Sequence, residues 1–252
     1  MEFLLPILIF VLSYMTFWFI VSLIIKRNDV ADFAWGLGFV LAAWFSFFYF
    51  GPSLKALIIN TLVTIWGLRL AFHIYKRNIN KPEDFRYQNW RNTWKYFYIR
   101  SYLQIFILQG ILMFAILVPV SFINKYVSNL LLLDLVGIIV WMFGFYFEST
   151  ADKQLSDFLH KPKNKGKLMT EGLWKYSRHP NYFGEVVQWW GLYLATLSIS
   201  NGYLTIIGPL TITFFILFVS GIPLLEQKYK GRPDFEEYKK NTSIFVPLPQ
   251  KK

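Results

Sequence analysis

The sequence predicts an all-α fold: a polytopic bundle of about seven transmembrane helices that forms a single integral membrane domain, residues 1–252. Three observations support this prediction. Hydrophobic residues make up 55% and aromatic residues 20% of the 252 residues. Charged residues make up only 16%, well below their share in ordinary soluble domains. Apolar runs long enough to cross a bilayer recur along the chain and leave little room for a separate soluble domain.

The first three predicted spans occupy the N-terminal part of the chain. Residues 3–25 form an apolar run without a preceding basic segment or a small-residue cleavage site, so we interpret it as a retained span and not as a signal peptide. Residues 30–50 form the second run. The sequence Gly51-Pro52-Ser53 predicts a turn before the third run, residues 54–75.

A polar segment separates these spans from the other four. Residues 76–100 mix basic and aromatic side chains, which is typical of a segment at the level of the lipid headgroups. We expect the next spans at residues 101–124 and 130–151, followed by a basic loop. The sixth, residues 182–200, is short and interrupted by glycines, so it either crosses fully or dips back. The seventh, residues 203–225, leads into a charged tail.

The distribution of basic residues predicts the orientation of the bundle. Of the 26 lysines and arginines, all except Lys55, Arg69 and Lys125 would lie on one side of a seven-span arrangement. The side rich in lysine and arginine normally faces the cytoplasm, so we expect the N-terminus outside and the C-terminus inside. The same asymmetry explains the net charge of +11 without a nucleic-acid partner.

A dense polar motif, residues 173–185, lies at the mouth of the sixth apolar segment. Pro180 ends any helix that precedes it and suits the first turn of a new one. The unpaired N–H groups of that turn, beside Arg178 and His179, would hold a phosphate or a carboxylate. Glu185 lies just inside the apolar segment, where a lone carboxylate indicates function. The structural alternative is an interfacial turn whose acid complements the helix dipole.

Other polar side chains lie within or at the edges of the predicted spans. One interpretation is mutual pairing, in which each acid is neutralised by a nearby base. The interpretation that we favour is a shared cavity open to the cytoplasm, because a bundle rarely needs so many buried charges for stability alone. Such a cavity, ringed by basic loops, suits a soluble anionic cofactor that meets a lipid-soluble substrate. Among these polar residues, Asp134 lies near the outer end of its span and Arg69 is an open case, whereas the others are expected to cluster towards the cytoplasmic half. The full set is Asp29, Asp32, Arg69, His73, Asp134, Glu148, Asp152, Glu185, Gln188 and Glu226.

Several common types of site are excluded by the sequence. The nearest match to a Gly-x-Gly-x-x-Gly fingerprint, Gly36-Leu37-Gly38, lies in a span and lacks the third glycine, which argues against a Rossmann domain. The sequence has no Walker phosphate loop, Gly-x-Ser-x-Gly elbow or His-Glu-x-x-His motif. Cysteine is absent, and His73, His160 and His179 are far apart in sequence, so we expect no metal centre.

The motif at residues 172–185 resembles the C-terminal region of the steroid 5-alpha reductase superfamily, and the rest of the chain resembles a bacterial branch described only as a domain of unknown function. The resemblance covers residues 28–248. The Arg-His-Pro-x-Tyr-x-Gly core is also similar to sterol reductases and to isoprenylcysteine carboxyl methyltransferases, which bind S-adenosylmethionine. Asn181 and Glu185 resemble the reductases more, and Glu226-Gln227 departs from the paired glutamates of the methyltransferases. The other matching segments are Asp32-x-x-Trp35-Gly36, Trp66-Gly67-x-Arg69-Leu70, Glu83-Asp84-x-Arg86-Tyr87, Glu148-x-x-x-Asp152-x-Gln154, and Glu226 with Tyr229 and Tyr238.

This resemblance implies a membrane-embedded, NADPH-dependent reductase of a conjugated carbon–carbon double bond. The substrate would be lipophilic, steroid-like or isoprenoid, and would come from the bilayer; the site would face the cytoplasm at a bacterial inner membrane. An acid and a tyrosine from earlier spans polarise the substrate in the better-known reductases, and the candidates here are Asp32 and Tyr87. The alternatives are an S-adenosylmethionine-dependent membrane methyltransferase and a non-enzymatic lipid-binding membrane protein.

The resemblance also implies which residues bind the cofactor. By physical role, Arg178 and nearby lysines would face the phosphates, whereas Asn181 and Glu185 would fix an amide or a ribose hydroxyl. The residues that match cofactor-associated positions are Asp152, Arg178, His179, Asn181, Tyr182, Glu185, Glu226 and Tyr229.

Overall fold

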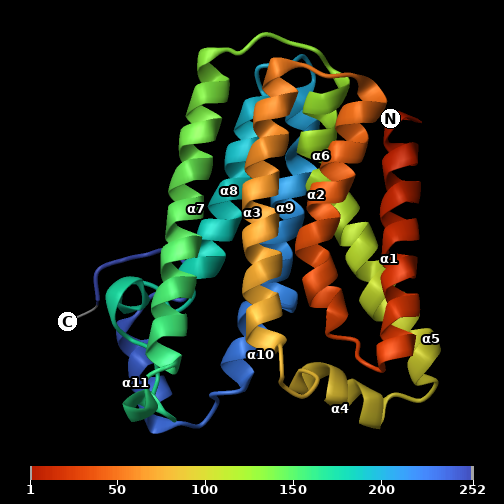
Figure 1. The fold of residues 1–252 in the computed structure, drawn as a ribbon. Coiled ribbons are helices and arrows are strands. Elements are labelled where there is room, and N and C mark those ends of the chain that lie inside the picture. The colour runs from red at the N-terminus through yellow and green to blue at the C-terminus, as the bar shows by residue number, and fades with distance from the viewer. Residues whose placement is uncertain (1, 251–252) are drawn as a thin grey trace. The chain divides into compact units, whose positions relative to one another are not determined.

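The computed structural model describes residues 2–250, and most of this chain is helical (Figure 1). Within that range there is no β-strand, and Ser177 and Ser243 form an isolated parallel bridge. The all-α class predicted from the sequence is therefore confirmed. The chain packs as two compact units. Unit 1 comprises the described residues up to Leu130 with Ile199–Gly208, and unit 2 comprises Leu131–Ser198 with the described residues from Pro209 onward.

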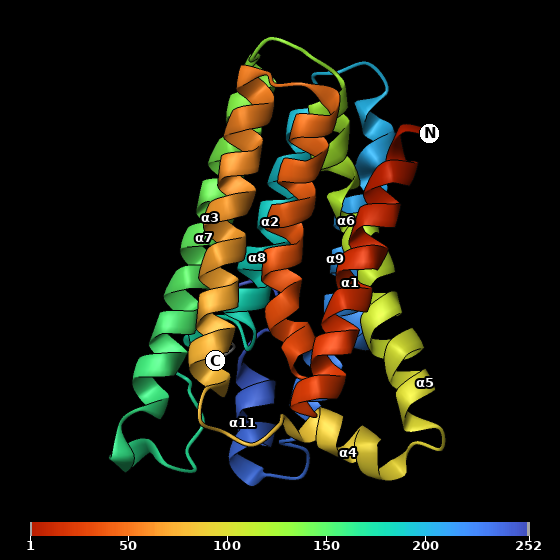
Figure 2. The ribbon, with the colours of Figure 1, turned by 45° about the vertical axis from the view of Figure 1, so that its right-hand side comes forward.

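Unit 1 is built on four long helices. Helices α1, α2 and α6 pack against one another, and α3 runs along α2, as Figures 1 and 2 show from two directions. Its elements are a 3-10 turn (Glu2–Leu4), α1 (Leu5–Ile25), α2 (Val30–Phe50), α3 (Leu54–Asn78), α4 (Phe85–Thr93), α5 (Phe97–Ser101), a π-helical segment (Tyr102–Ile107), α6 (Leu108–Lys125) and a 3-10 helix (Gly202–Ile206).

The close packing of α2 on α3 depends on two glycines. A Cβ atom added to Gly36 would lie 2.7 Å from the carbonyl oxygen of Gly67, and one added to Gly67 would lie 2.7 Å from the carbonyl oxygen of Gly36. These distances are far below van der Waals contact, so only glycine permits this approach of the two backbones. The contact holds the α2 helix, and with it Asp32 in its first turn, against α3.

Unit 2 is built on the α7–α8 pair and a C-terminal group of shorter helices. Helix α9 (Ile207–Phe214) continues from unit 1 into unit 2 along the chain. The other elements are α7 (Leu132–Leu159), two 3-10 turns (Pro162–Asn164 and Gly172–Lys175), α8 (Pro180–Thr196), a π-helical segment (Phe215–Val219), α10 (Ile222–Gln227) and α11 (Pro233–Asn241).

Glycines also bring α7 and α8 into backbone contact. A Cβ atom on Gly184 would lie 2.4 Å from the amide nitrogen of Glu148 and 2.5 Å from the carbonyl oxygen of Gly144. Two turns further along, a Cβ atom on Gly191 would lie 2.7 Å from the carbonyl oxygen of Gly137. We call this contact, formed by Gly137, Gly144, Gly184 and Gly191, the glycine seam. Polar side chains beside it form hydrogen-bonded pairs between α7 and the segment that comprises α8 and the two residues after it. The pairs are Asp134 with Ser198, Glu148 with Gln188, and Asp152 with Asn181.

Six helical segments among the described residues are long and apolar enough to cross a membrane. They correspond to six of the seven predicted spans, so the prediction of an integral membrane protein is confirmed. The remaining one is the predicted sixth span, α8, which has 17 residues and therefore about 26 Å of helix, somewhat less than the ~30 Å hydrocarbon core. The predicted orientation of the termini and the single membrane domain remain predictions. The six segments are Glu2–Ile25, Val30–Phe50, Leu54–Asn78, Phe97–Lys125, Leu132–Leu159 and Gly202–Gln227.

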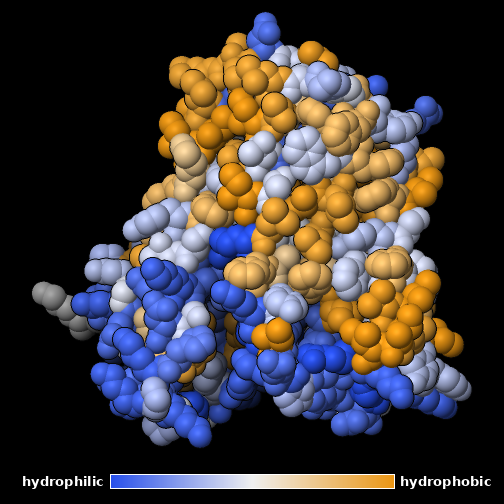
Figure 3. All heavy atoms as spheres, in the orientation of Figure 1, coloured by the Kyte–Doolittle hydropathy of each residue, from blue (hydrophilic) through white to orange (hydrophobic). Residues whose placement is uncertain are grey.

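Within each unit, polar and apolar side chains separate along the helices. In unit 2, hydrophilic residues gather over α11 and the turn that follows α7, whereas apolar residues cover the upper part of α7 in the view of Figure 3. In unit 1, hydrophilic residues gather over α4. The candidate functional residues of each unit therefore belong to its polar end or lie near it.

Candidate functional site

The start of α8 gathers the first group of candidate residues. Pro180 occupies the first helical position and His179 precedes it, as the sequence predicts. Arg178 and His179 are both buried, at 8% and 6% exposure. Arg178 Nε donates a hydrogen bond to Glu226 Oε1 at 2.7 Å, and His179 Nε2 lies 3.1 Å from the same oxygen. Three predicted cofactor-binding residues therefore form one cluster, joined across 48 residues of chain.

Arg178 also fixes the C-terminal tail. Its Nη1 atom donates to the carbonyl oxygens of Thr242, at 2.8 Å, and Lys239, at 3.3 Å, while its backbone N–H donates to the carbonyl oxygen of Ser243 at 2.8 Å. Tyr238 donates its hydroxyl hydrogen to the carbonyl oxygen of Trp174, and burial raises the pKa of this phenol above its ordinary value. The guanidinium is thus engaged by protein groups, which differs from its predicted contact with phosphates.

A second pair lies one residue into α8. Asn181 Nδ2 donates to Asp152 Oδ1 at 3.1 Å, so the structure brings these two predicted residues together. The other end of the amide, Asn181 Oδ1, is buried and has no hydrogen-bond partner within residues 2–250. A buried carbonyl oxygen without a partner is costly. A ligand that donates an N–H or O–H group to this oxygen would remove that cost.

The remaining predicted cofactor residues lie around these two groups. Tyr182 stacks on the His179 ring, with centroids 5.8 Å apart and an angle of 15° between the planes. Glu185 is half-buried one turn beyond Asn181 on α8. Tyr229 packs within the tail, with its ring 5.5 Å from that of Phe235 and with the Arg232 guanidinium 5.6 Å from its centroid.

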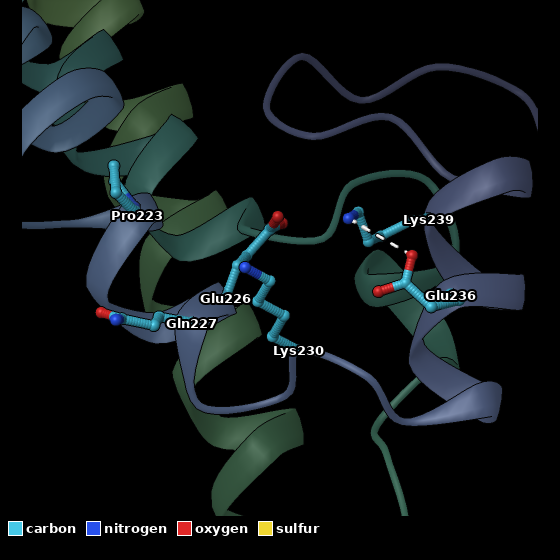
Figure 4. Close-up of a pocket in the computed structure, with 6 residues that line it drawn as sticks. All are labelled: Pro223, Glu226, Gln227, Lys230, Glu236 and Lys239. Atoms are coloured by element: carbon cyan, nitrogen blue, oxygen red, sulfur yellow. Dashed lines mark ion pairs between the residues drawn. The ribbon is translucent and has the colours of Figure 1, made fainter.

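A pocket of about 550 Å³ opens between α10 and α11 (Figure 4). It shares Glu226 with the Arg178 cluster. Two ammonium groups, from Lys230 and Lys239, line it, and Lys239 lies 3.4 Å from Glu236. The volume is within the usual range for small-molecule sites. The lining residues are Pro223, Glu226, Gln227, Lys230, Glu236 and Lys239.

The two predicted catalytic residues meet in unit 1. Tyr87 donates its hydroxyl hydrogen to Asp32 Oδ1 at 2.5 Å, and Arg86 Nη2 donates to Asp32 Oδ2 at 2.7 Å. The Tyr87 side chain is almost completely buried. Burial and the adjacent Asp32 carboxylate raise the pKa of Tyr87 well above its ordinary value, so the phenol keeps its proton at physiological pH.

Arg86 belongs to the segment Glu83-Asp84-Phe85-Arg86-Tyr87 but has no role in the site that the sequence predicts. The structure shows that Arg86 bridges two carboxylates, since its Nε atom also donates to Asp84 Oδ1 at 2.9 Å. Burial alone would raise the pKa of Asp84, but its bonds with Arg86 outweigh this and hold the pKa below the ordinary value. A signal for this arginine was present in the sequence, because Arg86 follows Asp84 by two residues and directly precedes the predicted catalytic residue Tyr87.

Comparison with known proteins finds relatives that are similar to this chain in sequence. A bovine (Bos taurus) 3-oxo-5-alpha-steroid 4-dehydrogenase 1 is 34% identical over 116 residues, covering 45% of this chain and 41% of the relative. The human (Homo sapiens) protein of the same name is 32% identical over 115 residues, with the same coverage. An uncharacterised protein of Schizosaccharomyces pombe is 27% identical over 206 residues, covering 69% of this chain and 59% of the relative.

These matches span less than half the length of the two dehydrogenases. No solved structure matches this chain. A family model described as "Protein of unknown function (DUF1295)" matches residues 18–242, which is most of the chain. The resemblance to steroid 5-alpha reductases that the motifs indicate is confirmed by these relatives. The chain therefore belongs to the DUF1295 family and is steroid 5-alpha reductase-like.

Proposed function

We propose that this protein is a membrane-embedded, NADPH-dependent reductase of a conjugated carbon–carbon double bond in a lipophilic substrate, steroid-like or isoprenoid. Support comes from the relatives named 3-oxo-5-alpha-steroid 4-dehydrogenase 1 and from the two clusters described above. The observation that carries the proposal is the buried, unpartnered Oδ1 atom of Asn181 beside Asp152. A free acceptor held by a neighbouring carboxylate fits a ligand that presents an amide N–H or a ribose hydroxyl.

The residues of unit 2 would bind and orient the cofactor. Asn181 Oδ1 accepts a hydrogen bond from the ligand while Asp152 holds the amide in that orientation. Arg178 and His179 hold the Glu226 carboxylate in place, and Arg178 also holds the C-terminal tail through the carbonyl oxygen of Thr242. Tyr182 extends this surface by stacking on His179. When bound, NADPH supplies the hydride, which is the chemistry that the side chains themselves lack.

The residues of unit 1 would hold the proton. The Tyr87 hydroxyl is directed at Asp32 Oδ1, and the Arg86 guanidinium holds that carboxylate in place through a hydrogen bond to Oδ2. Turning the hydroxyl from Asp32 toward a substrate carbonyl oxygen would polarise the conjugated system, so that the remote carbon accepts a hydride more readily. Asp32 then acts as a positioning residue, and the phenol is the acid.

A binding titration in detergent tests the proposal. We expect purified protein to bind NADPH and not S-adenosylmethionine. Asn181→Leu removes the free acceptor and should weaken NADPH binding by roughly 2- to 10-fold, the value of one hydrogen bond. Asn89→Leu, at an exposed position in unit 1, is the matched control and should leave affinity unchanged.

Two outcomes would contradict the proposal. Binding of S-adenosylmethionine without NADPH would support a methyltransferase instead. Binding of neither compound by folded protein would support a non-enzymatic lipid-binding protein.

A further inference from the structure

The pocket between α10 and α11 contains cations that the proposed cofactor contacts leave unused. Lys230 is exposed and forms no salt bridge in the part of the chain that the structure describes. Lys239 pairs with Glu236 at 3.4 Å, and both side chains are well exposed, at 39% and 46%. Exposed pairs of this kind contribute little and exchange readily. Figure 4 shows both lysine side chains beside the pocket, one from each wall.

The arginine that contacts the lining residue Glu226 already has several protein partners. Arg178 is 8% exposed, and its Nε and Nη1 atoms donate to Glu226 and to the carbonyl oxygens of Lys239 and Thr242. Glu226, the acid that Arg178 contacts, forms part of the pocket wall, so that its charge is balanced before any ligand arrives. The positive charge available to a ligand therefore comes from the two lysines.

Two exposed ammonium groups suit a terminal phosphate. A phosphate monoester carries a charge of about −1.5 to −2 at neutral pH, which two lysines balance. A pyrophosphate is more often bound at a helix N-terminus, through backbone N–H groups. The first turn of α11 already contains Asp234 and Glu236, whose carboxylates make that N-terminus unsuitable for a diphosphate.

We propose that this pocket binds the 2′-phosphate of NADPH, with Lys230 and Lys239 as the residues that select NADPH over NADH. The inference rests on the proposed function, because it concerns the same cofactor. On binding, the phosphate displaces Glu236 from Lys239 and contacts Lys230. NADH, which presents a hydroxyl at this position, leaves Lys239 paired with Glu236 and Lys230 without an anion, so it gains nothing from either lysine.

The test compares ligands that differ in the 2′-phosphate. Affinities for NADPH and NADH, and for adenosine 2′,5′-bisphosphate and adenosine 5′-monophosphate, are measured by calorimetry on the full-length protein in detergent. We expect the wild-type protein to favour each 2′-phosphorylated ligand by at least about 10-fold, since a charge-assisted hydrogen bond contributes that much or more. Lys230→Gln and Lys239→Gln should each reduce this preference by about 10-fold and leave NADH binding unchanged.

Lys240→Gln is the matched control, since Lys240 is the exposed neighbour of Lys239 on α11 and does not line the pocket. It should retain the preference. If the wild-type protein binds NADPH and NADH equally, or if the pocket variants weaken both cofactors to the same extent, the inference is wrong and the reductase proposal stands. If none of the nucleotides binds, both the proposed reductase function and the proposed 2′-phosphate site are wrong.

Discussion

The glycine seam between α7 and α8 can be tested by adding a single methyl group. In Gly184→Ala, the new Cβ atom would lie 2.4 Å from the amide nitrogen of Glu148 and 2.5 Å from the carbonyl oxygen of Gly144. Ordinary contact requires about 3.4 Å or more, so the helices must move apart locally by about 1 Å. Both obstructing atoms belong to the backbone, which cannot rotate away as a side chain would.

The cost of this substitution follows from two opposing effects. Forcing an extra methyl group into a packed interface costs about 1–3 kcal/mol, and more where backbone obstructs it. Alanine regains up to about 1 kcal/mol of helix propensity. We therefore expect a net loss of about 1–2 kcal/mol in the free energy of unfolding, which corresponds to roughly 2–8 °C in Tm for a chain of this length. The shift would also disturb the Asp152–Asn181 pair, so NADPH affinity should fall as well.

The assay is thermal unfolding of purified protein in detergent, with Gly110→Ala as the control. At Gly110 the nearest atoms are 3.2 Å and 3.3 Å away and belong to the flexible side chains of Met15 and Leu12, so the control should be neutral or slightly stabilising. The reciprocal variant, Gly144→Ala, should resemble Gly184→Ala, and the double variant should cost less than the sum because both methyl groups open the same contact. Equal melting temperatures for Gly184→Ala and Gly110→Ala would refute this account of the seam.

Three further outcomes follow from the two clusters. Arg178→Gln removes the donors that hold the tail and should lower the free energy of unfolding by about 1.5–3 kcal/mol. Trypsin should then cleave faster after Lys239. Arg232→Gln, which removes an exposed ion pair, is the control and should not change the rate of this cleavage. Tyr87→Phe should lower reductase activity by roughly 100-fold or more while changing stability by only about 1 kcal/mol, and a smaller loss of activity would exclude the phenol as the acid. Because the pKa of Tyr87 is raised in the folded state, the unfolded chain releases this proton first. Tyr87 should therefore leave the free energy of unfolding constant below about pH 10 and lower it above that pH, and Tyr87→Phe should abolish this part of the decline.

The sequence predicted the helices well because their signals are local. Apolar length predicted seven spans, and six of them match helices among the described residues that are long and apolar enough to cross a membrane. Pro180 predicted the beginning of α8, which runs from Pro180 to Thr196. The glycines of that segment were interpreted as interruptions. In the structure, Gly184 and Gly191 are the packing surface itself, matched by Gly144 and Gly137 on α7. The equal seven-residue spacing of the two pairs was a readable signal.

The contacts within the clusters were harder to predict because they join distant parts of the chain. Asp32 and Tyr87 are 55 residues apart, and no pattern of composition or periodicity pairs them; only the resemblance suggests the two together. The assignment of Arg178 to phosphates followed from its charge and from the helix start beside it. Its actual partners lie in the tail, and the return of residues 239–243 to this motif leaves no mark in a single sequence.

The contacts in unit 2 suggest a reason for the resemblance of the Arg-His-Pro core to families that use different cofactors. Arg178 and His179 are buried and contact Glu226 and the tail, so we infer that they hold the tail in place beside the proposed site. That task is independent of the ligand. The groups that could distinguish one cofactor from another are those left available, namely the Oδ1 atom of Asn181 and the ammonium groups of the pocket. A change of cofactor would then require substitutions at those positions, with the core itself unchanged.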